Sequence, residues 1–241
     1  GSDTKGSKTV ALGKDALGVQ NFTTATDTYN VGVGYYAGAN VTTGTRNTLI
    51  GSLSGDAITT GSQNSGFGMA SISSVTTGNN NTAVGYNSLD ANTTASNNTA
   101  VGHSAGLSVT TGIDNTLIGA TAGDALTDAD YNVAVGMQAL GGDTLGSRST
   151  AIGRRSLYSQ NFTTATDTYN TAVGFNSGYS VTTGIRNTLI GGLAGDALTD
   201  ADFNVAIGSH ALTHDTKGSK SIAIGHSALE NQNFTTATET Y

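Results

Sequence analysis

The stretch "NTAVGYNSLDANTTASN" (residues 81–97) decides the fold, because "NTAVGHSAGLSVTTGID" (98–114) follows it at once with the same length and the same plan. Both stretches open with Asn-Thr-Ala-Val-Gly and carry a Thr pair near their end. Related phrases such as "NTLIG", "NVAVG" and "STAIG" recur through the chain. A strict repeat of this length indicates a solenoid or another array of identical units.

The glycine that closes each phrase gives the period of the repeat. Successive glycines lie 17 residues apart, except for two gaps of 21 residues after Gly13 and Gly153. Three longer units share the phrase "QNFTTAT", at 20–26, 160–166 and 232–238. The sequence therefore predicts about 13 turns, three of them with 21 residues. The closing glycines are Gly13, Gly34, Gly51, Gly68, Gly85, Gly102, Gly119, Gly136, Gly153, Gly174, Gly191, Gly208 and Gly225.

Each unit predicts short strands and no helix. Residues such as Val133-Ala134-Val135-Gly136 alternate in the manner of a strand, and no periodicity of 3.6 residues is sustained. A second strand is expected at the Val-Thr-Thr-Gly phrases, for example 41–44 and 75–78. A three-sided roll would need an aliphatic residue every six positions, but Asp90 and Ser96 occupy those places after Val84. We therefore predict an all-β solenoid that is a flattened, two-stranded parallel β-roll.

Stacked turns place equivalent residues in columns along the axis. Ten units open with Asn, whose amides are expected to hydrogen-bond from turn to turn. The core of such a roll is thin, so we expect part of an apolar column to be buried between chains of a homotrimer. This apolar column is Leu12, Val33, Ile50, Phe67, Val84, Val101, Ile118, Val135, Ile152, Val173, Ile190, Ile207 and Ile224.

The composition restricts the possible partners and chemistry. The net charge is -7 without a basic stripe, so neither nucleic acid nor an anionic membrane is an expected partner. The absence of Cys excludes disulfides and thiolate chemistry, and no apolar run is long enough to span a membrane. We interpret residues 1–8 as a cloning remnant followed by a partial repeat, and residues 9–241 as a single repeat domain that is a fragment of a longer fibre.

The phrases "NTAVGYNSL", "KSIAIGHSAL", "NVAIGSHAL" and "STAIGRRSL" resemble a known repeat family. They are similar to the haemagglutinin-type repeats of YadA-like heads in trimeric autotransporter adhesins, and the similarity extends over the chain from residue 9. The resemblance implies a left-handed parallel β-roll that assembles as a trimer. Similar Asn-Thr-Ala-Val-Gly repeats occur in bacteriophage tail fibres. In both families the module is extracellular and serves attachment.

Aromatic and basic side chains that follow the closing glycine are the candidates for receptor contact. Aromatic rings on a polar surface can stack on sugars or anchor a protein partner. The candidates are Tyr35, Tyr36, Tyr86, Arg154, Arg155, Phe175 and Tyr179. We expect the partner to be a glycan or protein of a host-cell surface.

Calcium binding and ice binding are two further functions suggested by side chains that recur along the surface, whereas a cofactor site or a catalytic cluster is not expected. The acidic bends offer oxygen ligands for calcium, but their spacing matches no known calcium loop, so we predict no metal; these residues are Asp124, Asp128, Asp130, Asp196, Asp200 and Asp202. A rank of Thr on a solenoid is typical of ice-binding proteins, and this alternative function would use Thr42, Thr59, Thr76, Thr93, Thr110 and Thr127. No cofactor site or catalytic cluster is expected, since His103, His210, His214 and His226 fall at scattered places.

The sequence thus predicts a non-enzymatic segment of an extracellular fibre. The fibre would be a phage tail fibre or the head of a bacterial adhesin at the cell surface. Its role would be to present or space a surface that attaches to a host.

Overall fold

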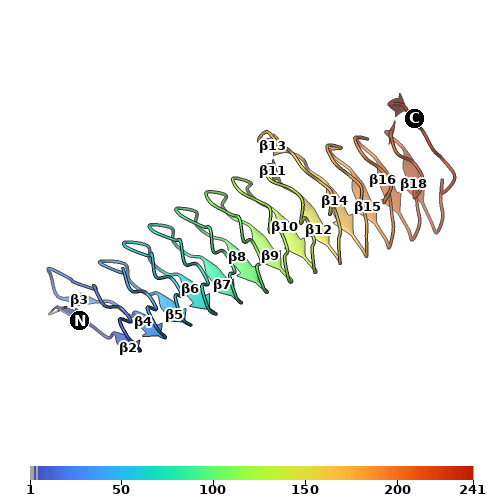
Figure 1. Ribbon diagram of the computed structural model, residues 1–241. Coiled ribbons are helices and arrows are strands. Elements are labelled where there is room, and N and C mark those ends of the chain that lie inside the picture. The colour runs from blue at the N-terminus through green and yellow to red at the C-terminus, as the bar shows by residue number, and fades with distance from the viewer. Residues whose placement is uncertain (1–2, 4, 241) are drawn as a thin grey trace. The chain divides into compact units, whose positions relative to one another are not determined.

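The structure is a computed structural model that describes residue 3 and residues 5–240. The two residues interpreted as a cloning remnant, 1 and 2, lie outside the described residues. The chain divides into two compact units, residues 1–115 and 116–241. Each unit is an all-β parallel β-solenoid, and the part of the chain that is described contains no helix (Figure 1). The predicted fold class is confirmed at this level.

The first unit contains a parallel sheet with one strand from each turn. Its strands follow the order β2-β4-β5-β6-β7-β8, so each turn pairs with the next turn along the chain. A separate pair joins β1 to β3 across the first long turn. The strands are β1 (Gly6–Ser7), β2 (Val10–Leu12), β3 (Thr26–Asp27), β4 (Val31–Val33), β5 (Thr48–Ile50), β6 (Ser65–Phe67), β7 (Thr82–Val84) and β8 (Thr99–Val101).

The second unit repeats this plan. Its main sheet has the order β9-β10-β12-β14-β15-β16-β18, and β11-β13 and β17-β19 are the pairs of its two long turns. The strands are β9 (Thr116–Ile118), β10 (Val133–Val135), β11 (Gly146–Ser147), β12 (Thr150–Ile152), β13 (Thr166–Asp167), β14 (Thr171–Val173), β15 (Thr188–Ile190), β16 (Val205–Ile207), β17 (Gly218–Ser219), β18 (Ile222–Ile224) and β19 (Thr238–Glu239).

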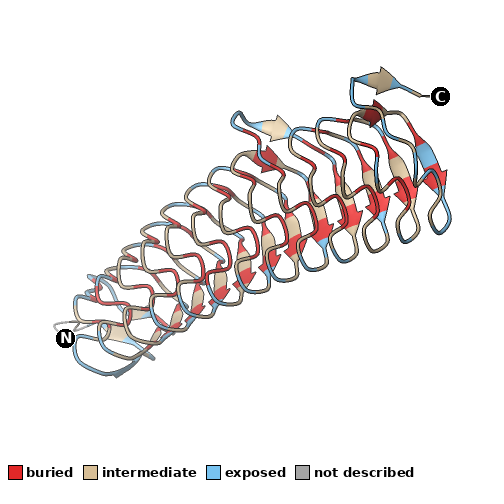
Figure 2. Cartoon of the chain, turned by 45° about the vertical axis from the view of Figure 1, so that its right-hand side comes forward, coloured by how far each residue is buried: buried red, intermediate tan, exposed pale blue. Residues whose placement is uncertain are grey.

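The middle residue of each main strand points inward, and its two neighbours point outward. Ala83 is fully buried, whereas Val84 is 37% exposed. Alternation along a strand requires this, because successive side chains lie on opposite faces. The apolar column of the sequence analysis therefore lies on the outer face of the strands: Ile50, Ile118 and Ile190 are 37–38% exposed. Figure 2 shows buried and partly exposed positions following one another along the strands of each unit.

The core is instead formed by inward-facing side chains in three columns, represented in one turn by Leu49, Gly55 and Ile58. A large side chain in one column lies beside a small residue in another. In the turn of β5, large residues at Leu49 and Ile58 enclose Gly55, where an added Cβ would lie 2.6 Å from Leu49 Cδ2. Gly55 also has a φ of +58°, which glycine adopts without a steric cost. In the turn of β7 the small Ala83 is matched by a buried Leu89. The turns thus fill a similar core volume, although the large and small residues occupy different columns from one turn to another.

The predicted ladder of Asn side chains is confirmed. In the first unit the buried Asn64 donates from Nδ2 to the carbonyl of Gly78 at 2.8 Å, and its Oδ1 accepts from the backbone N–H of Asn81 at 3.0 Å. Asn47 and Asn98 make the same bonds in their turns. The amide therefore closes its own turn and fixes its distance to the next one.

The prediction of a second strand at the Val-Thr-Thr-Gly phrases is wrong. These residues form bends, although their backbones still bond along the axis, as in Thr59 N–H to the carbonyl of Thr76 at 2.9 Å. Within residues 5–240, a second, two-residue ladder is present in the long turns alone.

A buried carboxylate organises each long turn of the second unit. Asp143 accepts hydrogen bonds from the backbone N–H groups of Gly146 and Phe162 and from Nε2 of Gln160. Gln160 in turn accepts from Asn170 and so takes the place of the missing Asn of that turn. Asp215 makes the equivalent contacts.

Candidate attachment surface

The corner after each main strand places a side chain in solvent. The closing glycine has a φ that L residues rarely adopt, for example +129° at Gly153, where an added Cβ would lie 2.3 Å from the carbonyl oxygen of Gly174. The residue that follows it is therefore turned outward. Tyr35, Tyr86 and Phe175 occupy this corner and are 44–50% exposed.

In the second unit the structure places four of the seven predicted contact residues in two groups, which are joined by the consecutive residues Arg154 and Arg155. The guanidinium of Arg154 lies 5.6 Å from the ring centre of Phe175, and that of Arg155 lies 5.6 Å from the ring of Tyr158. Tyr158 stacks on Tyr179 with 5.4 Å between ring centres and an interplanar angle of 11°. Such pairs hold aromatic side chains rigidly, which lowers the entropy lost on binding.

In the first unit the remaining candidates form two smaller groups. Tyr35 and Tyr36 lie 4.4 Å apart, and the Lys14 ammonium lies within 6 Å of both rings. Tyr86 stacks on His103 at 5.5 Å. Each group joins residues of adjacent turns, so its spacing is set by the solenoid.

Sequence reasoning missed Tyr158 and Gln138 as members of the surface in the second unit. Tyr158 is the stacking partner of both Arg155 and Tyr179, and Gln138 Oε1 accepts from Nε of Arg155 at 2.8 Å. The sequence does contain a signal for Tyr158, because Tyr158 and Tyr179 occupy equivalent positions in consecutive units. Aligning units by column, and not only by the residue after the glycine, would have found it.

The acidic residues considered for calcium are distributed over separate columns. Asp202 accepts from the backbone N–H of Ile185 at 2.7 Å, and Asp200 pairs with Lys217 at 3.4 Å. Among residue 3 and residues 5–240, no group of three or more His, Cys, Asp or Glu side chains is placed to hold a metal ion. Asp124 is half-buried, and this burial raises the pKa of its carboxyl group.

The Thr column considered for ice binding is half-buried. The hydroxyl of Thr59 donates to the carbonyl of Thr76 at 3.1 Å, and Thr42, Thr76 and Thr93 donate in the same way. Thr110 and Thr127 are half-buried as well. The exposed rank is the next residue along, formed in the first unit by Thr43, Thr60, Thr77, Thr94 and Thr111.

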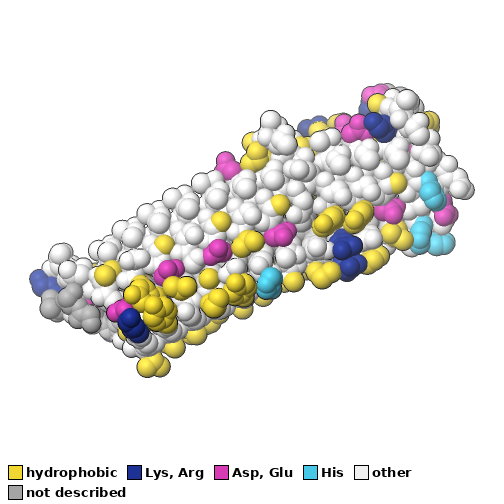
Figure 3. Space-filling view, viewed as in Figure 1, with side chains coloured by type: hydrophobic (Ala, Val, Ile, Leu, Met, Phe, Trp, Pro, Cys, Tyr) yellow, Lys and Arg dark blue, Asp and Glu magenta, His cyan; other side chains and the backbone are white. Residues whose placement is uncertain are grey.

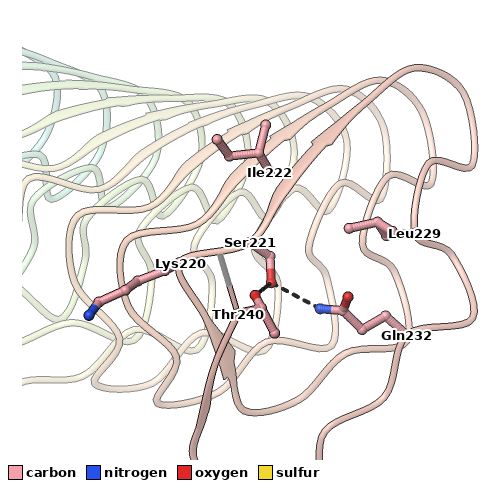
Figure 4. A pocket seen from close by; sticks show the side chains of 6 residues that line it. All are labelled: Lys220, Ser221, Ile222, Leu229, Gln232 and Thr240. Atoms are coloured by element: carbon pink, nitrogen blue, oxygen red, sulfur yellow. Dashed lines mark hydrogen bonds between the residues drawn. The ribbon is translucent and has the colours of Figure 1, made fainter.

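A hollow lies beside β18, and its polar groups bond to one another. Ser221 Oγ contacts Thr240 Oγ1 at 2.6 Å and accepts from Gln232 Nε2 at 2.9 Å (Figure 4). Ile222 and Leu229 supply its apolar walls.

His210 and His226 meet edge to face with 6.1 Å between ring centres, whereas the Nδ1 of His214 lies 2.7 Å from the carbonyl oxygen of Glu230. Among the described residues, the hollow beside β18 is not lined by a nucleophile paired with a histidine or carboxylate base.

No helix within the described residues is both long enough and apolar enough to cross a membrane. Neither family models, nor curated proteins, nor solved structures give a match to the chain.

Proposed function

We propose that the chain is a non-enzymatic attachment segment of an extracellular homotrimeric fibre. The fibre is a phage tail fibre or the head of a bacterial adhesin, its roll is left-handed, and its partner is a glycan or protein of a host surface. The single observation that carries this proposal is the rigid cation-aromatic surface built by Arg154, Arg155, Tyr158, Phe175 and Tyr179. Arg and Tyr are the residues most enriched where proteins bind partners strongly.

The outer face of the main sheet supports assembly with other copies of the chain. In the second unit Ile118, Ile152 and Ile190 are each 37–38% exposed along one line. A row of aliphatic side chains at the spacing of strands is costly to leave in water. Cyclic association of three chains would cover this row along the length of each unit.

The surface residues support attachment through direct contacts and not through long-range electrostatic attraction. Figure 3 displays one face, on which Lys and Arg side chains are set among hydrophobic ones. The net charge of -7 does not favour steering toward anionic surfaces. Aromatic stacking and directed hydrogen bonds are therefore the expected source of affinity.

The assembly is tested by measuring the mass in solution with light scattering. We expect about three times the chain mass of 24.1 kDa. The double variant Ile152→Asp with Ile190→Asp should dissociate the trimer, because it places charges on the aliphatic row. Thr183→Asp is the matched control, since equivalent turns carry Asp128 and Asp200 at this place. A wild-type protein that remains a monomer contradicts the trimer.

Attachment is tested with beads that carry the protein, incubated with bacterial and animal cells. We expect adhesion that falls when Arg154→Glu and Phe175→Ser are introduced together. The variant Thr43→Ser, in the first unit, should leave adhesion unchanged. Equal adhesion by all three proteins would remove the proposed surface from attachment.

Ice binding is the second candidate function, and one observation favours it. The first unit presents five exposed Thr residues on successive turns, at about 4.8 Å from one turn to the next. They are Thr43, Thr60, Thr77, Thr94 and Thr111. A regular rank of hydroxyl and methyl groups without charge is the kind of surface that orders water.

Thermal hysteresis of the purified protein separates the two functions. Ice binding predicts a hysteresis that Thr77→Tyr with Thr94→Tyr abolishes, because bulky rings break the flat rank. Thr59→Val, at a half-buried position, is the control. Absence of hysteresis in the wild-type protein rejects this second candidate.

A further inference from the structure

A second row of aromatic and cationic side chains lies on the second unit, apart from the surface around Arg154. Each main strand from β10 to β18 begins two residues after one member of this row. The parallel register of these strands therefore stacks the members on successive turns, where aromatic and cationic residues alternate. This pre-strand row is Tyr131, Arg148, Tyr169, Arg186, Phe203 and Lys220.

The backbone does not call for bulky residues at the places of the pre-strand row. All six members have a left-handed backbone, with φ between +52° and +65°. Asn and Asp adopt this conformation at a lower cost than larger side chains. Four successive turns of the first unit have polar residues at the equivalent place, with φ between +57° and +63°: Gln63, Asn80, Asn97 and Asp114. The local fold therefore does not explain the rings and long cations of the second unit.

The members of the pre-strand row contact one another from turn to turn. The guanidinium of Arg148 lies 4.8 Å from the ring centre of Tyr131 and 5.9 Å from that of Tyr169. The guanidinium of Arg186 lies 5.3 Å from the ring centre of Phe203. These contacts order the side chains but do not bury them, because the three aromatic residues are still 44–49% exposed. The row is thus an ordered ridge, and a ligand can lie along it without entering a cavity.

Carboxylates beside the pre-strand row add hydrogen-bond acceptors to its donors. Arg148 donates from Nε to Oδ1 of Asp167 at 2.9 Å, and Lys220 Nζ lies 2.8 Å from Oε2 of Glu239. Both carboxylate side chains are more than half exposed. Two of the three cations are therefore paired, so the ridge carries little net charge and offers both donors and acceptors to solvent.

The rings of the pre-strand row recur on every second turn. Tyr131 and Tyr169 are thus about 9.6 Å apart along the axis, as are Tyr169 and Phe203, at about 4.8 Å per turn. The three rings extend over about 19 Å of the second unit. Equal contacts at equal distances along a line suit a ligand that is itself extended and repetitive.

We propose that the pre-strand row binds a linear, uncharged glycan that lies along the axis of the second unit. Hydroxyl groups of the glycan bond to the guanidinium groups of Arg148 and Arg186 and to the carboxylates of Asp167 and Glu239. Its C–H groups pack against the exposed parts of the three rings. This proposal rests on the attachment function proposed above, and it names the class of ligand for a second surface.

The chemistry favours a neutral glycan over other extended or folded partners. Sugar hydroxyls both donate and accept, which matches exposed Arg–Asp and Lys–Glu pairs, and the C–H groups between them suit aromatic rings. An anionic polymer would meet Asp167, Glu239 and a chain with a net charge of -7. A folded protein partner gains most of its affinity from anchors that fill pockets, whereas the row is a ridge.

The test replaces the rings by the residue that the first unit has. The triple variant Tyr131→Asn, Tyr169→Asn and Phe203→Asn is expected to fold, because Asn80 occupies the equivalent place with a φ of +59°. Gln63→Asn is the matched control, at the same backbone position outside the row. Thermal unfolding by circular dichroism checks the fold, and Phe203→Asn alone replaces the triple variant if that variant does not fold.

The probes are linear di-, tetra- and hexasaccharides of glucose, mannose or N-acetylglucosamine on an array. Oligouronates and single-stranded DNA represent anionic polymers. We expect the wild-type protein to bind a subset of the neutral hexasaccharides about tenfold more tightly than the matching disaccharides, because the longer chain reaches more than one ring. The triple variant should bind these hexasaccharides about tenfold more weakly than the wild-type protein, and Gln63→Asn should bind them equally well.

Three results overturn the binding of a linear neutral glycan by the pre-strand row. They are hexasaccharide binding that survives the loss of the rings, equal affinity for short and long chains, and a preference for the anionic polymers. If the wild-type protein binds no glycan but beads carrying it still adhere to cells, this inference is wrong and the attachment function stands. If neither occurs, both proposals fail.

Discussion

The duplicated segments of the second unit, 116–169 and 188–241, share the plan of their strands and long turns but differ at many side chains, several of them at one corner. Both use a buried Asp and a Gln to hold the long turn, at Asp143 and at Asp215. At the corner, Gly141 and Tyr158 in one segment stand where the other has Thr213 and Glu230. Most of the differences lie at outward positions, such as Met137 and Arg154, so the surface changes while the inward columns keep the scaffold nearly constant.

The largest expected effect comes from removing the carboxylate that both segments share. Asp143→Ala leaves two backbone N–H groups and the Gln160 amide without an acceptor in a buried place. We expect the free energy of unfolding to fall by about 3 to 5 kcal/mol. Denaturant unfolding monitored by circular dichroism measures this change.

The equivalent substitution in the other segment, Asp215→Ala, tests whether burial determines the loss of stability. Gln232 and Phe234 are partly exposed, whereas Gln160 and Phe162 are buried, so water can replace part of what Asp215 provides. Asp215→Ala should therefore cost less than Asp143→Ala, and Asp143→Asn should cost least because it keeps one acceptor. Equal losses for both alanine variants would contradict the role of burial.

An intermediate effect is expected where one turn breaks the inward pattern of its neighbours. Asn92 is fully buried in a column that holds Val75 and Val109 on the adjacent turns, and its side-chain N and O have no hydrogen-bond partner among the described residues. Asn92→Val should raise the free energy of unfolding by about 1 to 3 kcal/mol, because it removes unsatisfied polar atoms. Asn92→Ser, which stays polar, is the control. A loss of stability in the valine variant would mean that a bound water satisfies the amide.

The smallest effect concerns the carboxylate at the corner where the segments differ. Burial raises the pKa of Asp124, so its ionised form costs stability at neutral pH, and that cost disappears as the pH falls through its raised folded pKa toward the ordinary value of 3.8. Asp124→Asn should therefore raise the melting temperature at pH 7 and leave it unchanged below pH 3.8. Thermal unfolding across this pH range measures it. A stabilisation that persists in acid would have another cause than ionisation.

Much of the fold followed from the sequence because the repeat itself carries the register. Once the Gly positions gave a period of 17 residues, the parallel pairing of Thr82–Val84 with Thr99–Val101 and the Asn ladder were fixed. The second strand at Val-Thr-Thr-Gly was wrong, because the pattern cannot tell an extended residue from a bend that bonds along the same axis. The sequence did not decide which side of each strand faces the core, since alternation gives two faces but not which one is inside.

The candidate surface was predicted only in part. Arg154, Arg155, Phe175 and Tyr179 were chosen for their place after a glycine, and the structure places them in two groups joined by the consecutive residues Arg154 and Arg155. Tyr158 and Gln138 were missed because their importance depends on contacts with adjacent turns. The Thr residues chosen for an ice face proved to be the half-buried member of each pair.

The repeat was sufficient to predict the all-β solenoid, its period and its side-chain ladders, because identical turns that stack in register bond to one another in the same way. The side chains that face the core and the acids that meet a hydroxyl group on another turn became known from the three-dimensional contacts alone. These depend on the distances between turns, about 4.8 Å apart, at which a missing side chain on one turn exposes groups of the two beside it. Thr213, for example, reaches the Asp196 carboxylate on the preceding turn, whereas its counterpart Gly141 has no side chain to reach Asp124.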